Sequence, residues 1–147
     1  MSQLSYYFIA CLAGAVLPIQ ALINARLGMH ISGPLWAAAA SFAIGSLVLI
    51  VTQLVFHAPP SLGQISATPL WLWIGGFLGA IYMGGAVTSV SKIGAGAMIA
   101  LIIVAQIGTS MVIDHFGVLV PQAHPFGIAR LIGTVLLLSG TMLILRF

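Results

Sequence analysis

The chain has 147 residues, of which 61% are apolar and only 3% are charged. Four basic residues and one acidic residue cannot cover a soluble domain, in which roughly 25% of residues are charged, so the composition excludes a water-soluble globular protein. The basic residues also form no cluster that could bind phosphates, which argues against nucleic acid as a partner.

Five stretches of the chain are long and apolar enough to span a membrane as helices. A helix needs about 20 apolar residues to cross about 30 Å of hydrocarbon. The stretches cover residues 4–23, 34–56, 70–90, 95–113 and 126–145, and glycine or proline occurs in each connection between them, as is typical of helix ends. The sequence therefore predicts an all-α, polytopic membrane protein with a single transmembrane domain over residues 1–147, surrounded by the lipid bilayer.

Polar residues interrupt the first stretch near its end. Pro18 has no backbone N–H, so the carbonyl of Gly14 loses its helical partner, and we expect a helix break that lines a cavity. Gln20 and Asn24 are four residues apart and share a helix face, where two amides could hydrogen-bond a polar solute. The alternative is that both amides bond neighbouring backbone or mark the helix end, since Asn24 and Arg26 belong to the predicted first connection.

Small residues form a stripe along the third stretch. Gly76, Ala80 and Gly84 recur every four residues, and Gly75 and Gly79 lie beside them. Lipid gives apolar helices little reason to associate, so close backbone packing at small residues has to hold them together. The stripe predicts a helix-packing surface, but its pattern is the same for packing within one chain and for packing between two chains.

The fourth stretch contains a polar ribbon. Gln106, Ser110 and Asp114 follow at intervals of four residues, and polar groups inside a span mostly face protein or water. Asp114 is the only acidic residue and precedes His115, whose imidazole titrates near neutral pH, as a proton-coupled carrier would require. Alternatively, these last two residues end the helix at the water interface.

Arg130 lies about one turn inside the fifth stretch. Its long side chain could extend to the interface. Otherwise it faces the other helices, where it could pair with Asp114 or attract an anionic group.

The distribution of basic residues gives only a weak preference for one orientation. Arg26, Lys92 and Arg146 fall on the side of the C-terminus, and Arg130 falls on the other side. Because lysine and arginine favour the cytoplasmic side, this places the C-terminus in the cytoplasm. A majority of three to one is slim, so insertion in both orientations stays possible.

Enzyme chemistry is nearly absent from the sequence. The histidines His30, His57, His115 and His124 lie on different connections without metal-ligand spacing, and there is no phosphate-binding loop or nucleophile motif. The whole chain has one carboxylate, so most hydrolytic mechanisms lack the acidic and basic side chains that they need. We therefore expect no enzyme activity, no metal and no cofactor.

Several stretches together resemble the YdcZ type of inner-membrane exporter, a family of the drug/metabolite transporter superfamily. The resemblance rests on Pro18-Ile19-Gln20 with Asn24, Trp71 through Tyr82, Gly94-Ala95-Gly96, Gln106 through Gly117, and Arg130 with Gly133. It covers essentially the whole chain, and the end of the fourth stretch is its most specific part. The resemblance implies a multi-pass protein of the bacterial inner (cytoplasmic) membrane.

The resemblance also implies an assembly. Larger members of the superfamily have ten spans in two halves of opposite orientation, so a chain with five spans is similar to one half of this inverted repeat. Two chains would then have to pair as an antiparallel homodimer, or with a paralogous partner. One departure concerns the substrate, because small multidrug-resistance relatives have an essential glutamate in their first span. Gln20 and Asn24 are neutral here, which favours a neutral polar or anionic substrate.

These observations together predict a secondary transporter that exports a small polar organic molecule by alternating access. The residues expected to contact the substrate are Gln20, Asn24, Tyr82, Gln106 and Ser110, and those expected to act in coupling or gating are Asp114, His115 and Arg130. Two alternatives stay open: a small membrane subunit that packs against a partner protein without transporting, and a passive channel.

Overall fold

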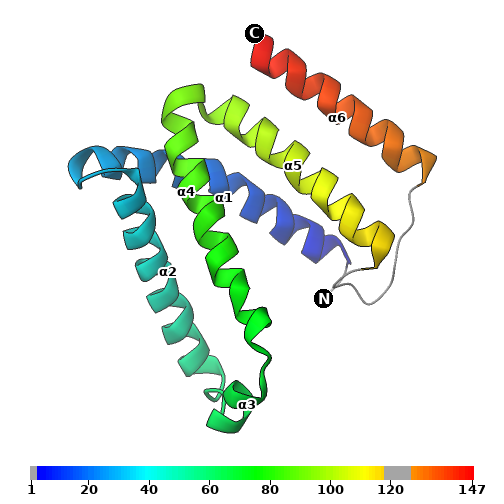
Figure 1. Cartoon of the computed structure of the whole chain (residues 1–147). Helices are drawn as coiled ribbons and strands as arrows, with labels where there is room; N and C mark the ends of the chain where they lie inside the picture. The colour runs from blue at the N-terminus through cyan, green and yellow to red at the C-terminus, as the bar shows by residue number, and fades with distance from the viewer. Residues whose placement is uncertain (1–2, 118–126) are drawn as a thin grey trace. The chain divides into compact units, whose positions relative to one another are not determined.

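The computed structural model describes residues 3–117 and 127–147, which are mostly helical and contain no strand (Figure 1). Five helical segments are long and apolar enough to span a membrane: α1 (Gln3–His30), α2 (Pro34–Phe56), η1 with α4 (Leu70–Trp73 and Ile74–Ile93), α5 (Ala95–Phe116) and α6 (Ile128–Arg146). A short helix, α3 (Leu62–Ala67), lies between α2 and η1. The predicted all-α polytopic fold with five spans is confirmed.

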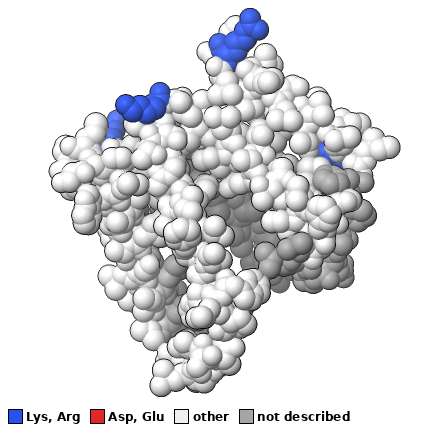
Figure 2. Space-filling view, in the orientation of Figure 1, with Lys and Arg blue, Asp and Glu red and all other residues white. Residues whose placement is uncertain are grey.

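Most large apolar side chains are exposed in this single chain. The face in Figure 2 shows lysine and arginine at only a few places on an otherwise uncharged surface. Burial of these side chains from water therefore has to come from lipid or from another chain, because the chain does not bury them itself.

The first helix is longer than predicted. The expected end at residue 23 is wrong, since α1 continues to His30 and includes Asn24 and Arg26. The chain turns only where Ser32 and Gly33 adopt positive φ angles of 40° and 117°, and Pro34 then begins α2. By contrast, the predicted start and end of the second span agree with α2. The predicted start of the fifth span, Phe126, lies outside the described residues.

Pro18 lies inside α1, and the helix does not break there, contrary to the prediction. Proline removes one backbone donor and crowds the preceding turn. Leaving the helix would expose several more backbone groups to hydrocarbon, each at a cost of several kcal/mol. Continuing the helix with one missing hydrogen bond therefore costs less than ending it in the middle of a span.

The chain divides into two compact units, Met1–Lys92 and Ile93–Phe147, and each is described by itself. In the first unit, Ala38 of α2 packs with Met83 and Val87 of α4, and Ala25 of α1 lies against them. Val87 is fully buried. Three helices therefore meet around a small core.

Two glycines allow the close packing of this unit. A Cβ at Gly28 would lie 2.9 Å from the backbone nitrogen and Cα of Pro34, a distance that real Cβ atoms essentially never show. A Cβ at Gly84 would lie 3.3 Å from Leu35, which is also a tight contact. The absence of a side chain at residue 28 thus lets the start of α2 approach the end of α1.

The small-residue stripe of α4 is only partly used within the described chain. A Cβ at Gly79 would be in ordinary contact with the ring of Phe42, at 3.7 Å. At Gly75 and Gly76 an added Cβ would meet no described atom within 4 Å, and Ala80 is exposed. The predicted packing surface therefore contains a part that packs against α2 and a part that the first unit leaves uncovered.

In the second unit, α5 and α6 pack against each other. α5 ends at Gly117, whose φ of 65° is left-handed and whose N–H donates to the carbonyl of Ile113. α6 begins after Gly127, which provides no side-chain cap. These two helix ends position the charged residues of the chain's candidate site.

Candidate functional site

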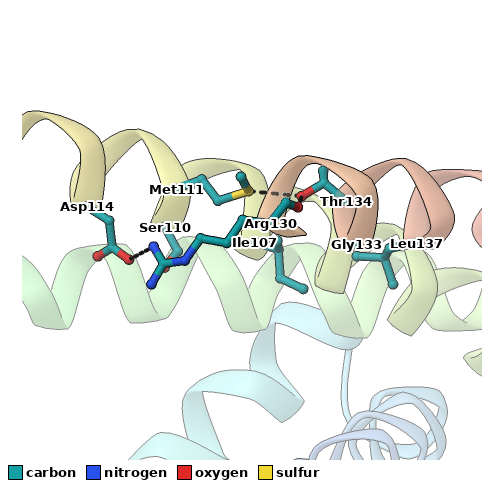
Figure 3. A pocket seen from close by; sticks show the side chains of 8 residues that line it. All are labelled: Ile107, Ser110, Met111, Asp114, Arg130, Gly133, Thr134 and Leu137. Carbon is teal, nitrogen blue, oxygen red and sulfur yellow. Dashed lines mark hydrogen bonds and ion pairs between the residues drawn. The ribbon is translucent and has the colours of Figure 1, made fainter. Parts of the chain in front are cut away.

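An ion pair joins the last turn of α5 to the first turn of α6. Nη1 of Arg130 donates to Oδ2 of Asp114 at 3.3 Å (Figure 3). The side chains are 47% and 27% exposed, respectively. The pairing of Arg130 with Asp114, one of the alternatives that the sequence leaves open, is therefore present in the structure.

Each member of this pair lies at the unfavourable end of its helix. A carboxylate near a helix C-terminus and a cation near a helix N-terminus both oppose the helix dipole, at a cost of about 0.3–1 kcal/mol each at exposed sites. Asp114 lies two residues before the end of α5, and Arg130 is the third residue of α6. Each charge therefore compensates the other, and a change at one leaves the other poorly stabilised.

The pair lies at a groove between α5 and α6 with a volume of about 430 Å³. Its lining consists of Ile107, Ser110, Met111 and Asp114 from α5 and Arg130, Gly133, Thr134 and Leu137 from α6. Small-molecule sites occupy about 300–1,000 Å³ and are mostly apolar with a few polar groups. The groove has the size and the mixed lining of such a site.

Thr134 of α6 lies against Met111 of α5 beside the pair. Its Oγ1 lies 2.9 Å from the carbonyl oxygen of Arg130 and 3.0 Å from Sδ of Met111. A hydroxyl has one proton to donate, and the carbonyl is the stronger acceptor, so the sulfur contact is the weaker one. The hydroxyl of Ser110 is the other neutral polar side chain in the lining. In Figure 3 the Arg130 side chain extends past Ser110 towards Asp114.

The three residues of the predicted polar ribbon on α5 do not all lie in the groove. Ser110 and Asp114 line the groove, whereas Gln106 is exposed and does not. In a helix of 3.6 residues per turn, each step of four residues rotates by about 40° beyond a full turn, so two steps rotate by about 80°. Gln106 and Asp114 are two steps apart and therefore do not share one face.

The other predicted contact residues belong to the first unit. Asn24 is 3% exposed, and its Nδ2 lies 3.7 Å from Sδ of Met83, a weak acceptor. Gln20 and Tyr82 are half-buried. Asn24 thus presents its amide to α4 in the interior of residues 1–92, and the amides do not mark the helix end.

His115 is exposed, and its ring lies edge-on to Phe116 with 5.1 Å between the centroids. It is absent from the groove lining. The described residues contain no group of three histidine, cysteine, aspartate or glutamate side chains that could hold a metal ion, and His124 lies outside them.

Five lining residues were not predicted as site residues, namely Ile107, Met111, Gly133, Thr134 and Leu137. Helical spacing from the charged residues could have indicated several of them. Met111 precedes Asp114 by three positions and Thr134 follows Arg130 by four, so each shares a face with its charged neighbour.

Comparisons with known proteins agree with this architecture. A model of the family described as "Putative inner membrane exporter, YdcZ" matches residues 5–143, which is nearly the whole chain. No curated protein and no solved structure matches the chain.

Proposed function

Since the chain belongs to the YdcZ family and is a multi-pass protein of the inner membrane, we propose that it is a secondary transporter that exports a small polar organic molecule by alternating access. One observation gives the main support: the groove between α5 and α6 contains an ion pair, Asp114 with Arg130, at the adjoining ends of two largely apolar spans. Ionisable groups in spans are costly, and they mark substrate and ion pathways in many membrane proteins.

In this proposal the ion pair acts as a gate. A single hydrogen bond of 3.3 Å is longer than the roughly 2.7–2.9 Å of a strong charge-assisted bond, so the pair opens at low cost. Asp114, Arg130 and the neighbouring His115 thus serve coupling or gating. Gln20, Asn24, Tyr82, Gln106 and Ser110 contact the substrate during transport.

We further propose that the working unit is a homodimer of antiparallel chains, each supplying half of an inverted repeat in the manner of the drug/metabolite transporter superfamily. Gly75, Gly76 and Ala80 on α4, which the first unit leaves uncovered, support a second copy as the partner, and so does the amide of Gln106, which is exposed on α5. Transport sites of inverted-repeat carriers lie at the interface between repeats. The slim bias of basic residues supports insertion in both orientations.

The proposal includes the absence of enzyme activity, which the single carboxylate of the chain supports. The test begins with a metabolite library screened for thermal stabilisation of the purified chain. Flux of each stabilising compound is then measured in proteoliposomes. A carrier gives a rate that saturates with concentration. A passive channel gives a rate that does not saturate, and a non-transporting subunit gives neither stabilisation nor flux.

A further inference from the structure

We infer that the groove between α5 and α6 binds an organic carboxylate with an apolar tail, and that this carboxylate replaces Asp114 on Arg130. The inference rests on the proposed transport function and names its substrate class. It follows from the donors of Arg130 that the described residues leave without an acceptor, from the lining of the groove and from the position of Asp114.

The guanidinium of Arg130 has more donors than the described residues use. Arginine offers five N–H groups in a planar fork that fits both oxygens of a carboxylate. Within residues 3–117 and 127–147, its side chain makes one hydrogen bond, through Nη1 to a single oxygen of Asp114. A free carboxylate is not tied to the backbone of α5, so it can form the two parallel, shorter bonds of a bidentate pair.

The remainder of the groove favours an apolar tail. Ile107 and Met111 of α5 and Leu137 of α6 supply aliphatic and thioether surface next to the charged end. Gly133 lies in the lining without a side chain, and an added Cβ there would meet no described atom within 4 Å. Inorganic anions could not use this apolar wall, and Arg130 would repel organic cations once Asp114 has left it.

Asp114 can leave the guanidinium without being trapped in hydrocarbon. It lies two residues before the end of α5, and its side chain is already 27% exposed. The exchange replaces one carboxylate by another, so the charge next to Arg130 is unchanged when the ligand binds. Asp114 therefore acts as an internal competitor that occupies Arg130 in the empty state.

The test measures binding to the purified full chain in nanodiscs of zwitterionic phosphatidylcholine. The probes are hexanoate, the shorter acetate, the neutral hexanamide and the cationic hexylamine. We expect hexanoate to bind most tightly. Arg130→Gln should weaken hexanoate binding about tenfold or more, which corresponds to the loss of a charge-assisted hydrogen bond. Asp114→Asn should strengthen it several-fold because the competitor is gone.

Two further variants keep the test informative. Arg146→Gln removes a cation from the other end of α6 and should bind hexanoate as the wild type does. Arg130→Lys keeps the charge but loses the fork, so an intermediate affinity is expected even where Arg130→Gln fails to fold.

The inference is overturned by equal binding of hexanoate and hexanamide, or by weaker hexanoate binding in the folded Asp114→Asn variant. It is also overturned if phosphatidylglycerol added to the nanodiscs blocks Arg130 and excess hexanoate does not displace it, since the groove would then be a lipid site. If another solute shows saturable flux and hexanoate does not bind, the carboxylate substrate class is refuted and the transport function is not. If hexanoate binds and no solute shows flux, the transport function is refuted and the binding site for a carboxylate is not.

Discussion

The side-chain amide of Asn24 points into the first unit, where its Nδ2 lies 3.7 Å from Sδ of Met83. A sulfur at this distance is a poor substitute for the oxygen acceptors that an amide can have in water. Asn24 nevertheless is 3% exposed, beside a core of Met83, Val87 and Ala38. An amide so placed contributes little to stability, and a role in binding would explain its presence.

Asn24→Leu should therefore preserve folding and abolish transport. Replacing a poorly bonded buried amide by an apolar group of similar size is close to neutral for stability. The measurements are the thermal unfolding of the purified variant and its flux in proteoliposomes. Thr52→Val is the matched control, because the Thr52 hydroxyl donates to the carbonyl of Val48 in its own helix. Wild-type flux in Asn24→Leu would remove Asn24 from the proposed site.

Gly28→Ala should destabilise the first unit. Its Cβ would lie 2.9 Å from the backbone of Pro34, and backbone cannot move aside as a flexible side chain does. Overpacking of this kind typically costs about 1–3 kcal/mol. Gly14→Ala in the same helix is the control, since its Cβ would meet no described atom within 4 Å. Because alanine has a better helix propensity than glycine, the free energy of unfolding of this control should be unchanged or higher by up to about 1 kcal/mol. Equal melting temperatures of the two variants would contradict the close approach of α1 and α2.

Asp114→Asn and Arg130→Gln should each lower the melting temperature, and the double variant should lose less than the sum of both. Because both charges oppose their helix dipoles, each single variant leaves an uncompensated charge. The coupling from a double-mutant cycle should be at most about 1 kcal/mol, since the pair is partly exposed. Added salt should reduce it. Strict additivity of the two single effects would show that the pair contributes nothing.

Gly76→Leu should lower the dimer fraction without changing the helix content of the chain. The first unit leaves this position uncovered, so a leucine fits there within the unit and obstructs a second chain that packs on it. Energy transfer between labelled chains in liposomes measures the dimer fraction. Gly140→Leu is the control on α6, where an added Cβ also meets no described atom within 4 Å. An unchanged dimer fraction in Gly76→Leu would place the interface elsewhere.

The sequence predicts the spans well because hydrocarbon thickness and apolar runs determine them. The second span agrees at both ends, since Gly33-Pro34 begins it and His57-Ala58-Pro59-Pro60 follows it. The end of the first span was wrong because Asn24 and Arg26 suggested a connection, whereas a helix accepts polar residues that face protein or the membrane surface.

The candidate site could be predicted only in part. Ser110 and Asp114 were found because they share a face of one helix. The pairing of Asp114 with Arg130 stayed one alternative among three, because it depends on how α5 and α6 are packed. Met111 and Thr134 were missed for the same reason, since an apolar or hydroxyl side chain becomes part of a groove only when a second helix forms the opposite wall.

The proposed function requires that the purified chain transports a solute without a partner protein. The most direct measurement is the flux, in proteoliposomes that contain the purified chain alone, of the compound that stabilises it most in the thermal screen. We expect a rate that saturates with concentration and that falls when Arg130→Gln or Ser110→Ala replaces the wild type. A rate that rises linearly with concentration would instead indicate a passive channel, and no flux above that of protein-free liposomes for any stabilising compound would show that the chain alone does not transport.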